Sequence, residues 1–85
     1  DRCEDAVETF DKALALNFLD RDAFFNRGFC LFKLGFQEKA IEDYNSAIKL
    51  DPSFAEAYYN RALARIIVYA NCAACSDLRT AASLG

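Results

Sequence analysis

A spacing of 34 residues recurs along this chain of 85 residues. Alanines stand at that interval, and the first of them in each unit is followed four residues later by a larger apolar side chain. The matched sets are Ala6, Ala40 and Ala74; Phe10, Tyr44 and Leu78; Ala13, Ala47 and Ala81; and Leu16, Leu50 and Leu84. A constant period of this length is typical of stacked helical units, each of which buries its apolar face against the next. Arrays of this kind usually serve as surfaces that hold other proteins.

The most complete unit runs over residues 21–54, and its residue types follow a definite order. An aromatic residue is followed four residues later by a small one, and the unit closes with a proline. This order resembles the tetratricopeptide repeat, in which an aromatic start and a small residue precede an Ala-x-x-x-Phe motif and a closing proline. Arg27 departs from the pattern, since the family usually has leucine there. The matching positions are Phe24, Gly28, Ala40, Tyr44, Ala47 and Pro52.

The resemblance covers the whole chain and implies an all-α fold. Antiparallel helix-turn-helix repeats would stack as an α-solenoid, with a right-handed superhelix implied by the resemblance. We expect a single domain over residues 1–85, made of a half repeat (1–20), a repeat (21–54) and a repeat (55–85). Because the chain opens inside a repeat and closes without a polar capping helix, we expect it to be an excerpt of a longer array. The alternative is that its end faces meet another copy of the chain.

Apolar residues recur at helical spacing along the chain. Pro52 marks a helix end, because the residue before a proline is pushed away from the helical region. Gly35, after Leu34, provides a tight turn between two antiparallel helices. We therefore predict five helices, over about 3–16, 21–34, 37–50, 55–68 and 71–83.

The turn of the last unit departs from the pattern, because residues 68–71 contain neither glycine nor proline. Asn71 is the residue there that can cap the following helix or adopt a left-handed conformation. One interpretation is an ordinary turn closed at Asn71. The other is a continuous helix from about 55 to 83, which would place the last helix on a second chain and give a homodimer through residues 55–85.

Four cysteines include Cys72 and Cys75, which form a Cys-x-x-Cys motif. A zinc site needs four converging ligands, but the chain has no histidine, and Cys3 and Cys30 are expected on other helices. A thioredoxin-like dithiol needs a strand-to-helix context, which a helical array lacks. We therefore predict no metal and no cofactor, with Cys30 and Cys75 as small core residues and Cys72 as a candidate reactive thiol. Free cysteines without an extracellular signature favour an intracellular, cytoplasmic location.

Composition disfavours several classes of function. The net charge is −3 and the basic residues are scattered, which argues against a nucleic-acid partner. Apolar residues recur periodically rather than in a run of about eighteen or more, so neither a membrane span nor a membrane partner is predicted. Without histidine, a Gly-rich phosphate loop or a nucleophile elbow, the chain is not expected to be an enzyme. Carboxylates such as Glu38, Glu42 and Asp43 are interpreted as a solvated helix face.

In the tetratricopeptide family, one stripe of the first helix of each unit faces a concave groove. Residues at i, i+3, i+4 and i+7 form such a stripe. We expect its aromatic residues to hold apolar side chains of a peptide, and Asn26 and Asn60 to pair with a peptide backbone. The alternative is that both asparagines bond locally and that Phe25 and Phe29 pack against a neighbouring segment. The predicted groove stripe comprises Asp22, Phe25, Asn26, Phe29 and Lys33, with Glu56, Tyr59, Asn60, Leu63 and Ile67.

Some family members bind the acidic C-terminal tails of heat-shock chaperones through Lys, Arg and Asn side chains on three successive first helices. Asn26 fits one position of this clamp, but the next unit has Glu56 and Asn60 at the matching positions, and neither is basic. With the register shifted by one unit, Phe25 and Phe29 occupy the places of the clamp's Lys and Asn. The expected partner is therefore an apolar or mildly basic peptide or helix rather than an acidic tail.

Two functions remain. The first is a protein–protein interaction module, which binds a peptide or helix of a partner protein in the concave groove and acts as a scaffold or adaptor. The second is a structural or self-assembling segment of a larger repeat protein, as a swapped or end-to-end dimer.

Overall fold

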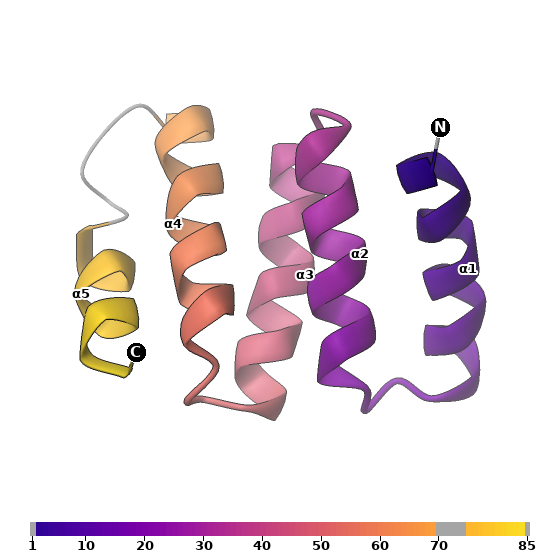
Figure 1. Cartoon of the computed structure of the whole chain (residues 1–85), viewed down its shortest axis with the longest axis horizontal. Helices are drawn as coiled ribbons and strands as arrows, with labels where there is room; N and C mark the ends of the chain where they lie inside the picture. Colours follow the sequence, from indigo (N-terminus) through magenta and orange to yellow (C-terminus); the bar gives the residue numbers. More distant parts are fainter. Residues whose placement is uncertain (1, 70–74, 85) are drawn as a thin grey trace.

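The computed structural model describes residues 2–69 and 75–84, and the side chains of all of these except residues 75–79. The described residues form five α-helices and no strand, which confirms the predicted all-α fold (Figure 1). The first four helices agree with the prediction to within one residue at each end. Residues 70–74, where the last helix was expected to begin, lie outside the described residues. The helices are α1 (Arg2–Leu16), α2 (Arg21–Lys33), α3 (Gln37–Leu50), α4 (Ala55–Tyr69) and α5 (Cys75–Leu84).

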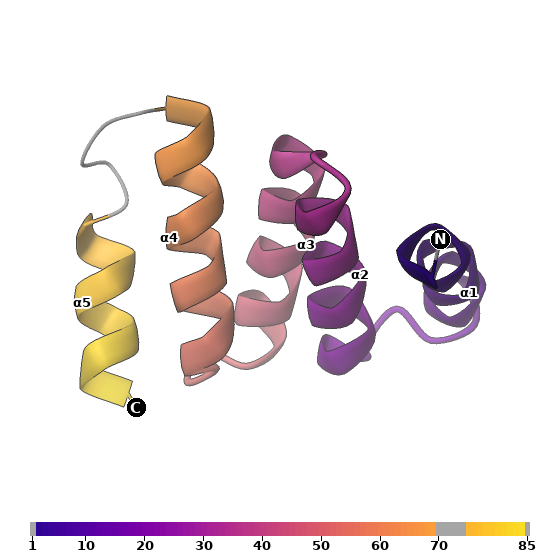
Figure 2. The ribbon, with the colours of Figure 1, turned by 45° about the horizontal axis from the view of Figure 1, so that its top comes forward.

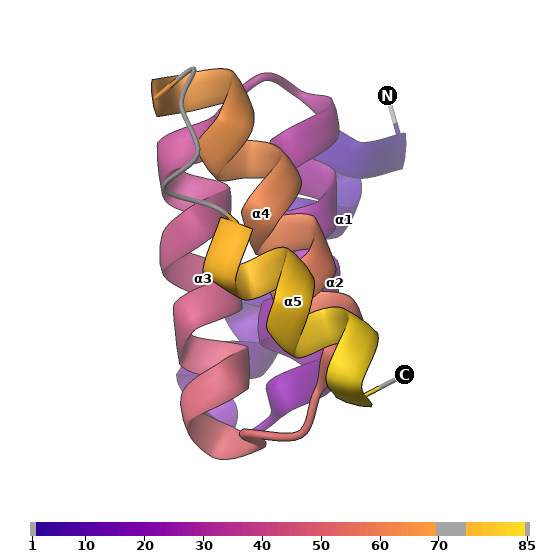
Figure 3. The same cartoon turned by 90° about the vertical axis from the view of Figure 1, so that its left-hand side faces the viewer.

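The helices stand in a row, and each is antiparallel to the one before it (Figures 1 and 2). Viewed along the row, α5 is nearest to the viewer and α1 is farthest (Figure 3). Consecutive helices pack against one another, and α2 also approaches α4. In the described part of the chain, neither α1 and α3 nor α3 and α5 come this close. The helices that open the two complete units thus converge on one side of the row, which makes that side the concave one.

Asp20 defines the start of α2. Its Oδ1 accepts hydrogen bonds from the backbone N–H groups of Asp22 at 3.1 Å and Ala23 at 3.2 Å. The backbone of Asp20 is extended, with φ −93° and ψ 97°, which is the usual conformation of an N-cap residue. Because the first N–H groups of a helix have no acceptor within the helix, this cap fixes where α2 begins. It therefore also fixes the orientation of the stripe that begins at Asp22.

The turn between α2 and α3 closes at Gly35, as predicted. Gly35 has φ +93°, and no heavy atom lies within 4 Å of the place where a Cβ would stand, so the backbone conformation is what requires glycine. The Phe36 N–H donates to the Leu31 carbonyl at 2.8 Å, and the Gly35 N–H donates to the Phe32 carbonyl at 3.1 Å. These two bonds form a Schellman motif, which satisfies the last carbonyls of α2 and reverses the chain.

The core is centred on Tyr44 of α3, which is fully buried. A Cβ added to Gly28 of α2 would lie 2.9 Å from Cε1 of Tyr44 and 3.1 Å from Cβ of Asp43. Glycine therefore lets α2 approach α3 more closely than any other residue would. The predicted packing positions Gly28, Ala40, Ala47 and Ala62 are all buried, whereas Ala74 lies outside the described residues.

Arg27 joins three helices, which explains why it replaces the leucine of the family pattern. Its Nε and Nη2 donate to Oδ2 and Oδ1 of Asp43 at 2.8 and 2.7 Å, and its Nη1 donates to Oδ1 of Asp11 at 2.8 Å. These hydrogen bonds, with the charge of Asp43, raise the pKa of Arg27 even though burial lowers it. The interpretation of Asp43 as a solvated residue is wrong, because it is buried to pair with Arg27; Glu38 and Glu42 are exposed as predicted.

A related contact occurs one repeat later. Nη1 of Arg61 donates to Oδ1 of Asn45 at 2.7 Å, and both residues stand 34 positions after Arg27 and Asp11. The arginine of each first helix therefore reaches back to the second helix of the preceding unit. The repeated apolar contacts are thus accompanied by a repeated polar contact, and both kinds of contact join a unit to its neighbour.

The last two helices are separate in this structure. α4 ends at Tyr69, α5 begins at Cys75, and the two lie side by side and antiparallel (Figures 1 and 3). The single chain therefore does not form the continuous helix over residues 55–83. Asn71, at which the other interpretation closes the turn, lies outside the described residues.

Candidate interaction surface

The α2 half of the groove stripe begins directly after the Asp20 cap and ends in the last turn of the helix. Asp22, Asn26 and Lys33 are exposed along it. Phe29 keeps 41% of its surface exposed, and Nζ of Lys33 lies 4.9 Å from the centroid of its ring. An ammonium over an aromatic face contributes about 0.5–1 kcal/mol at an exposed site. This contact is too weak to prevent a partner from binding to the ring. Phe29 is therefore the main candidate contact on α2.

Phe25 is placed differently, because it packs inside the protein. Its ring centroid lies 5.8 Å from that of Tyr44 and 4.9 Å from that of Phe54, which directly precedes α4. Tilted aromatic pairs at such distances contribute about 0.5–1.5 kcal/mol each beyond the area that they bury. This arrangement corresponds to the alternative prediction, in which Phe25 packs against a neighbouring segment. The ring joins α2 to α3 and to the start of α4.

The first three α4 residues of the groove stripe come together at a hollow of about 570 Å³ between α4 and α5. Tyr59 is 51% exposed there, and Glu56 is exposed beside it. A carboxylate, a phenol and a carboxamide thus border an otherwise apolar surface, which suits an apolar side chain with a basic or polar neighbour. This α4–α5 hollow is lined by Ala55, Glu56, Tyr59, Asn60, Ala81 and Ala82.

The last two α4 residues of the stripe lie apart from the first three. Leu63 is half-buried, and Ile67 is 55% exposed at the opposite end of the helix. Ile67 lines a second hollow of about 500 Å³, together with Val68 and with residues 35–39 at the α2–α3 turn. The structure therefore brings three predicted residues of α4 together and places Ile67 in a separate depression.

Asn60 faces the core as well as the α4–α5 hollow. The hydroxyl oxygen of Tyr44 is buried and makes no hydrogen bond of normal length within the described residues, although the Asn60 side chain lies near it. Burial raises the pKa of the Tyr44 hydroxyl above its ordinary value, and Asn60 only partly offsets this effect. Asn60 thus has a polar neighbour within its own protein, as the alternative prediction for the asparagines expects, and also borders the hollow.

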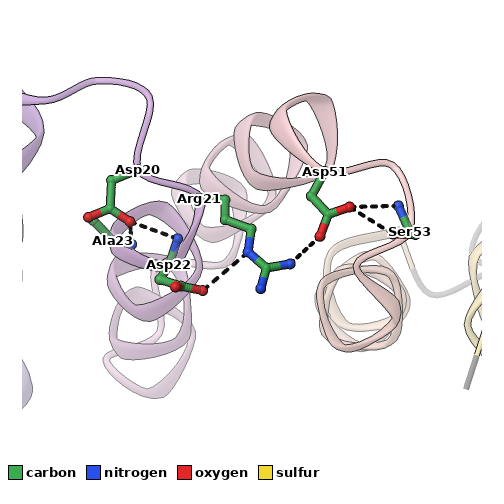
Figure 4. Close-up of polar contacts among 6 residues, drawn as sticks. All are labelled: Asp20, Arg21, Asp22, Ala23, Asp51 and Ser53. Carbon is green, nitrogen blue, oxygen red and sulfur yellow. Dashed lines mark hydrogen bonds and ion pairs between the residues drawn. The ribbon is translucent and has the colours of Figure 1, made fainter.

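A polar cluster holds the start of α2 against the connection between α3 and α4 (Figure 4). Arg21 forms an ion pair with Asp51, and its guanidinium carbon lies 4.3 Å from the centroid of the Phe54 ring. Ser53 donates to Oδ1 of Asp51 from Oγ at 2.8 Å and from its backbone N–H at 3.2 Å. These hydrogen bonds, together with Arg21, hold the pKa of Asp51 below its ordinary value. The cluster fixes the first turn of α2 relative to the first turn of α4. These two turns carry Asp22 and Glu56, the acidic residues of the groove stripe.

Several residues that shape this surface were not among the predicted site residues, and Ala55 of α4 is one of them. Ala81 and Ala82 form the α5 wall of the hollow, and Arg21 and Phe54 fix the spacing of the two inner helices. A signal for Ala81 exists, because the 34-residue period pairs it with the buried Ala47 and so marks it as a contact position. Arg21 and Phe54 stand at opposite ends of one repeat, and no local pattern connects them.

The remaining sequence predictions concern the cysteines and the membrane. Cys30 is half-buried, and the side chains of Cys72 and Cys75 lie outside those described. The described residues contain no group of three or more His, Cys, Asp or Glu side chains placed to hold a metal ion. Within the same part of the chain, every helix is too short or too polar to cross a membrane.

Both a family model and proteins of known sequence match this chain. A family model described as TPR repeat matches residues 31–65, from the end of α2 through most of α4. The TPR repeat-containing thioredoxin TTL4 of Arabidopsis thaliana is 34% identical to the chain over 56 residues, which are 66% of the chain. The chain belongs to the tetratricopeptide repeat family. This tetratricopeptide repeat chain spans only 8% of the plant relative's length, so the two share a repeat segment.

Two solved structures resemble the tetratricopeptide repeat chain over nearly its whole length. The first is the TPR2B-domain:pHsp70 complex of yeast Sti1, which is 31% identical with a TM-score of 0.91 and covers 98% of this chain and 66% of that one. The second TPR of Spaghetti (RPAP3), bound to the HSP90 peptide SRMEEVD, is 28% identical with a TM-score of 0.93 and covers 98% and 77%. Both confirm the stacking of tetratricopeptide repeats seen here.

Proposed function

We propose that this tetratricopeptide repeat chain is a protein–protein interaction module, which binds a peptide or helix of a partner protein on its concave side as a scaffold or adaptor. The proposal depends on Phe29 and Tyr59, which are 41% and 51% exposed on the converging helices α2 and α4. Neither ring closes the core, which is centred on Tyr44. Exposed aromatic side chains on a concave surface favour partner binding. The TPR domains of Sti1 and Spaghetti, solved with pHsp70 and with an HSP90 peptide, add support by similarity.

The charges of the groove stripe favour a partner that is apolar or mildly basic. Asp22 and Glu56 lie in the first turns of the parallel helices α2 and α4, so both carboxylates stand at the same end of the groove. Lys33 stands at the other end of α2. A basic side chain near Glu56, followed by apolar side chains over Tyr59 and Phe29, would match this distribution. The peptide SRMEEVD has three acidic residues and would bring them toward carboxylates.

Binding is tested by selecting peptides from a displayed random library on the immobilised 85-residue chain and measuring their affinities by fluorescence polarisation. Phe29→Ala and Tyr59→Ala should each weaken the best selected peptide by about tenfold, because each removes an aromatic contact. Phe18→Ala is the matched control, since Phe18 is 69% exposed on the connection between α1 and α2, away from the groove stripe, and it should leave affinity unchanged. SRMEEVD serves as an acidic probe and should bind more weakly than the selected peptides. Selected peptides that bind all three variants equally would refute the proposed site.

A second candidate function is favoured by the α4–α5 hollow. Phe25 packs on Phe54, which directly precedes α4, and Ala47 of α3 is fully buried. Tyr59 and Ala81 stand 34 residues after Phe25 and Ala47 and line the hollow. The hollow therefore lies at the position that corresponds, one repeat later, to the surface on which α4 packs. If a helix of a further repeat or of a second copy lies there, the chain is a structural or self-assembling segment of a larger repeat protein, as an end-to-end or swapped dimer.

The solution mass of the chain, measured by light scattering across a concentration series, tests self-assembly. If two copies meet at the hollow, the chain is a dimer, and Ala82→Arg should restore the monomer because Ala82 is exposed on the α5 wall. Ser83→Arg is the matched control, since Ser83 is also exposed but does not line the hollow. A monomer at every concentration would exclude self-assembly and leave the hollow to a different helix or peptide.

A further inference from the structure

Each of the six residues that line the α4–α5 hollow has a counterpart 34 positions earlier in the chain. The counterparts stand on α2 and α3, so the same positions of the repeat occur twice among the described residues. We call the earlier set the α2–α3 counterpart. The lining residues Ala55, Glu56, Tyr59, Asn60, Ala81 and Ala82 correspond to Arg21, Asp22, Phe25, Asn26, Ala47 and Ile48.

Phe54 shows what covers these positions in the α2–α3 counterpart. Its ring centroid lies 4.9 Å from that of Phe25 and 4.3 Å from the guanidinium carbon of Arg21. Phe25 is half-buried, whereas Tyr59, its equivalent in the next unit, is 51% exposed. No aromatic ring of the described residues packs on Tyr59 in this way. The hollow therefore has room for an aromatic side chain that its counterpart already holds.

The charges at the two places differ. In the α2–α3 counterpart, Arg21 supplies a cation, which pairs with Asp51 and whose Nε lies 3.4 Å from Oδ1 of Asp22 (Figure 4). Ala55 stands at the position of this arginine in the hollow, so the lining residues include Glu56 and no cation. Glu56 is exposed and forms no ion pair with any residue that the structure describes. A carboxylate beside an apolar surface favours a partner that brings a cation to it.

We propose that the α4–α5 hollow is a subsite for an aromatic side chain of a partner protein that has a lysine or arginine within two residues of it. The aromatic ring lies on Tyr59, as Phe54 lies on Phe25. The cation pairs with Glu56 and lies beside the ring, at the place that Arg21 fills one unit earlier. The inference rests on the proposed binding of a peptide on the concave side, and it names two residue types that such a peptide contains.

The aromatic residues of the chain's own connections do not match this pair of residue types. Phe18 and Phe36 are 69% and 50% exposed in the connections that precede α2 and α3. Each is followed two residues later by a carboxylate, Asp20 and Glu38 respectively. If a second copy placed one of these rings in the hollow, it would bring a carboxylate toward Glu56, and like charges oppose association.

A basic residue stands one position after each of these carboxylates, but both basic residues already contact groups of their own chain. Arg21 is paired with Asp51, and Nζ of Lys39 lies 5.4 Å from the centroid of the Phe36 ring. The charges therefore favour a different protein over a second copy as the occupant of the hollow.

An oriented peptide library tests the pairing of residue types. Peptides with a fixed phenylalanine and two random positions on each side of it are displayed in many copies on phage and selected on the immobilised 85-residue chain. We expect lysine and arginine to be enriched beside the phenylalanine. Glu56→Gln should abolish this enrichment, because it removes the carboxylate that attracts the cation. Glu42→Gln is the matched control and should keep the enrichment, since Glu42 is an exposed carboxylate of α3 that does not line the hollow.

The best selected peptide then measures each contact by itself. Replacing its phenylalanine by alanine should weaken binding to the parent chain by about tenfold. Replacing its basic residue by glutamine should weaken binding to the parent chain by about fivefold and leave binding to Glu56→Gln unchanged. Ala55→Arg introduces the arginine of the α2–α3 counterpart and should also remove the preference for a basic peptide. Circular dichroism checks that each variant remains helical.

The subsite and the proposed function fail in different ways. Selected peptides without a preference for lysine or arginine, or with a preference that persists in Glu56→Gln, would overturn the subsite and leave peptide binding in place. Peptides that bind Phe29→Ala and Tyr59→Ala as well as the parent chain would refute the concave binding site itself. If the chain is a dimer that Ala82→Arg separates, a second copy occupies the hollow, and the proposed subsite is wrong.

Discussion

Arg27 and Asp43 form a two-point ion pair between α2 and α3, with N–O distances of 2.8 and 2.7 Å. The Asp43 side chain is only 6% exposed, and both of its oxygens accept a hydrogen bond from the guanidinium. Such geometry is needed to offset the cost of removing a carboxylate from water. Since α2 carries Phe29, this pair holds one helix of the proposed binding surface against α3.

We expect Arg27→Ala to lower the free energy of unfolding by about 2–3 kcal/mol, because it leaves the Asp43 carboxylate buried without its partner. The value is below that of a fully buried pair, since water reaches the 22% of the Arg27 side chain that is exposed. Urea denaturation measures the loss. Asp11→Asn is the matched control, because Asp11 pairs with the same arginine but its side chain is 56% exposed, and this substitution should cost less than about 1 kcal/mol. Equal losses in the two variants would contradict the central role of Asp43.

Gly28→Ala should destabilise the chain although alanine favours helices. Alanine gains about 1 kcal/mol of helix propensity, but its Cβ would stand 2.9 Å from the Tyr44 ring, and overpacking of this kind typically costs about 1–3 kcal/mol. We expect a net loss of about 1 kcal/mol in urea denaturation and shifted NMR signals of the Tyr44 ring. Gly35→Ala should cost about as much through its positive φ alone and leave those signals in place. A Gly28→Ala chain more stable than the parent would show that α2 can move away from α3 at no cost.

Asp51 should contribute to stability in a pH-dependent way. Hydrogen bonds from Ser53, with the charge of Arg21, lower its pKa in the folded chain below the ordinary value of 3.8. A depressed folded pKa means that the contribution is complete above the ordinary value and is lost as the pH falls through the lower folded value. We expect the free energy of unfolding to drop below about pH 4, and Asp51→Asn to remove part of that drop.

The pKa of Asp51 is measured directly by NMR titration of its carboxyl carbon. Ser53→Ala should raise this pKa toward the ordinary value, because it removes the Oγ hydrogen bond and keeps the one from the backbone N–H. An Asp51 carboxyl that titrates at its ordinary value in the parent chain would contradict the cluster drawn in Figure 4.

Tyr44→Phe should leave stability unchanged or raise it by up to about 1 kcal/mol. The substitution keeps the buried ring and its contact with Phe25, and removes a hydroxyl that is buried without a hydrogen bond of normal length. Tyr44→Leu, which leaves space in the core, should lose about 2–3 kcal/mol in the same urea experiment. A loss above about 1 kcal/mol for Tyr44→Phe would mean that Asn60 holds the hydroxyl in a stronger bond than the structure indicates.

The helices were predictable because each repeat buries small and aromatic residues at the same positions. Ala40 and Tyr44, which recur in the 34-residue period, are two of these buried residues. Their ends were predictable at Gly35 and Pro52 for local reasons. The division of labour among the groove residues was not predictable, since Phe25 and Phe29 are the same residue type one helical turn apart. Phe25 packs against Phe54, which lies in the connection between α3 and α4. The spacing of residues along α2 alone does not predict this contact.

Asp43 illustrates the same limit for charge. Beside Glu42, it fits the solvated face of an amphipathic helix. Its burial follows from Arg27, sixteen residues earlier on another helix, where the family pattern leads one to expect leucine. A departure from a repeat pattern is thus a signal for a compensating residue, but it does not say where that residue stands.

The close approach of Gly28 to Tyr44 bears on how binding specificity can evolve in such a chain. The curvature of a solenoid accumulates from small rotations between successive helices, so the spacing at one hidden contact alters the width of the groove several helices away. A substitution at this contact would change how well a partner fits, although every side chain in the groove stayed the same. Relatives with identical groove residues can therefore differ in their ligands, and comparisons of specificity must include the residues buried between the helices.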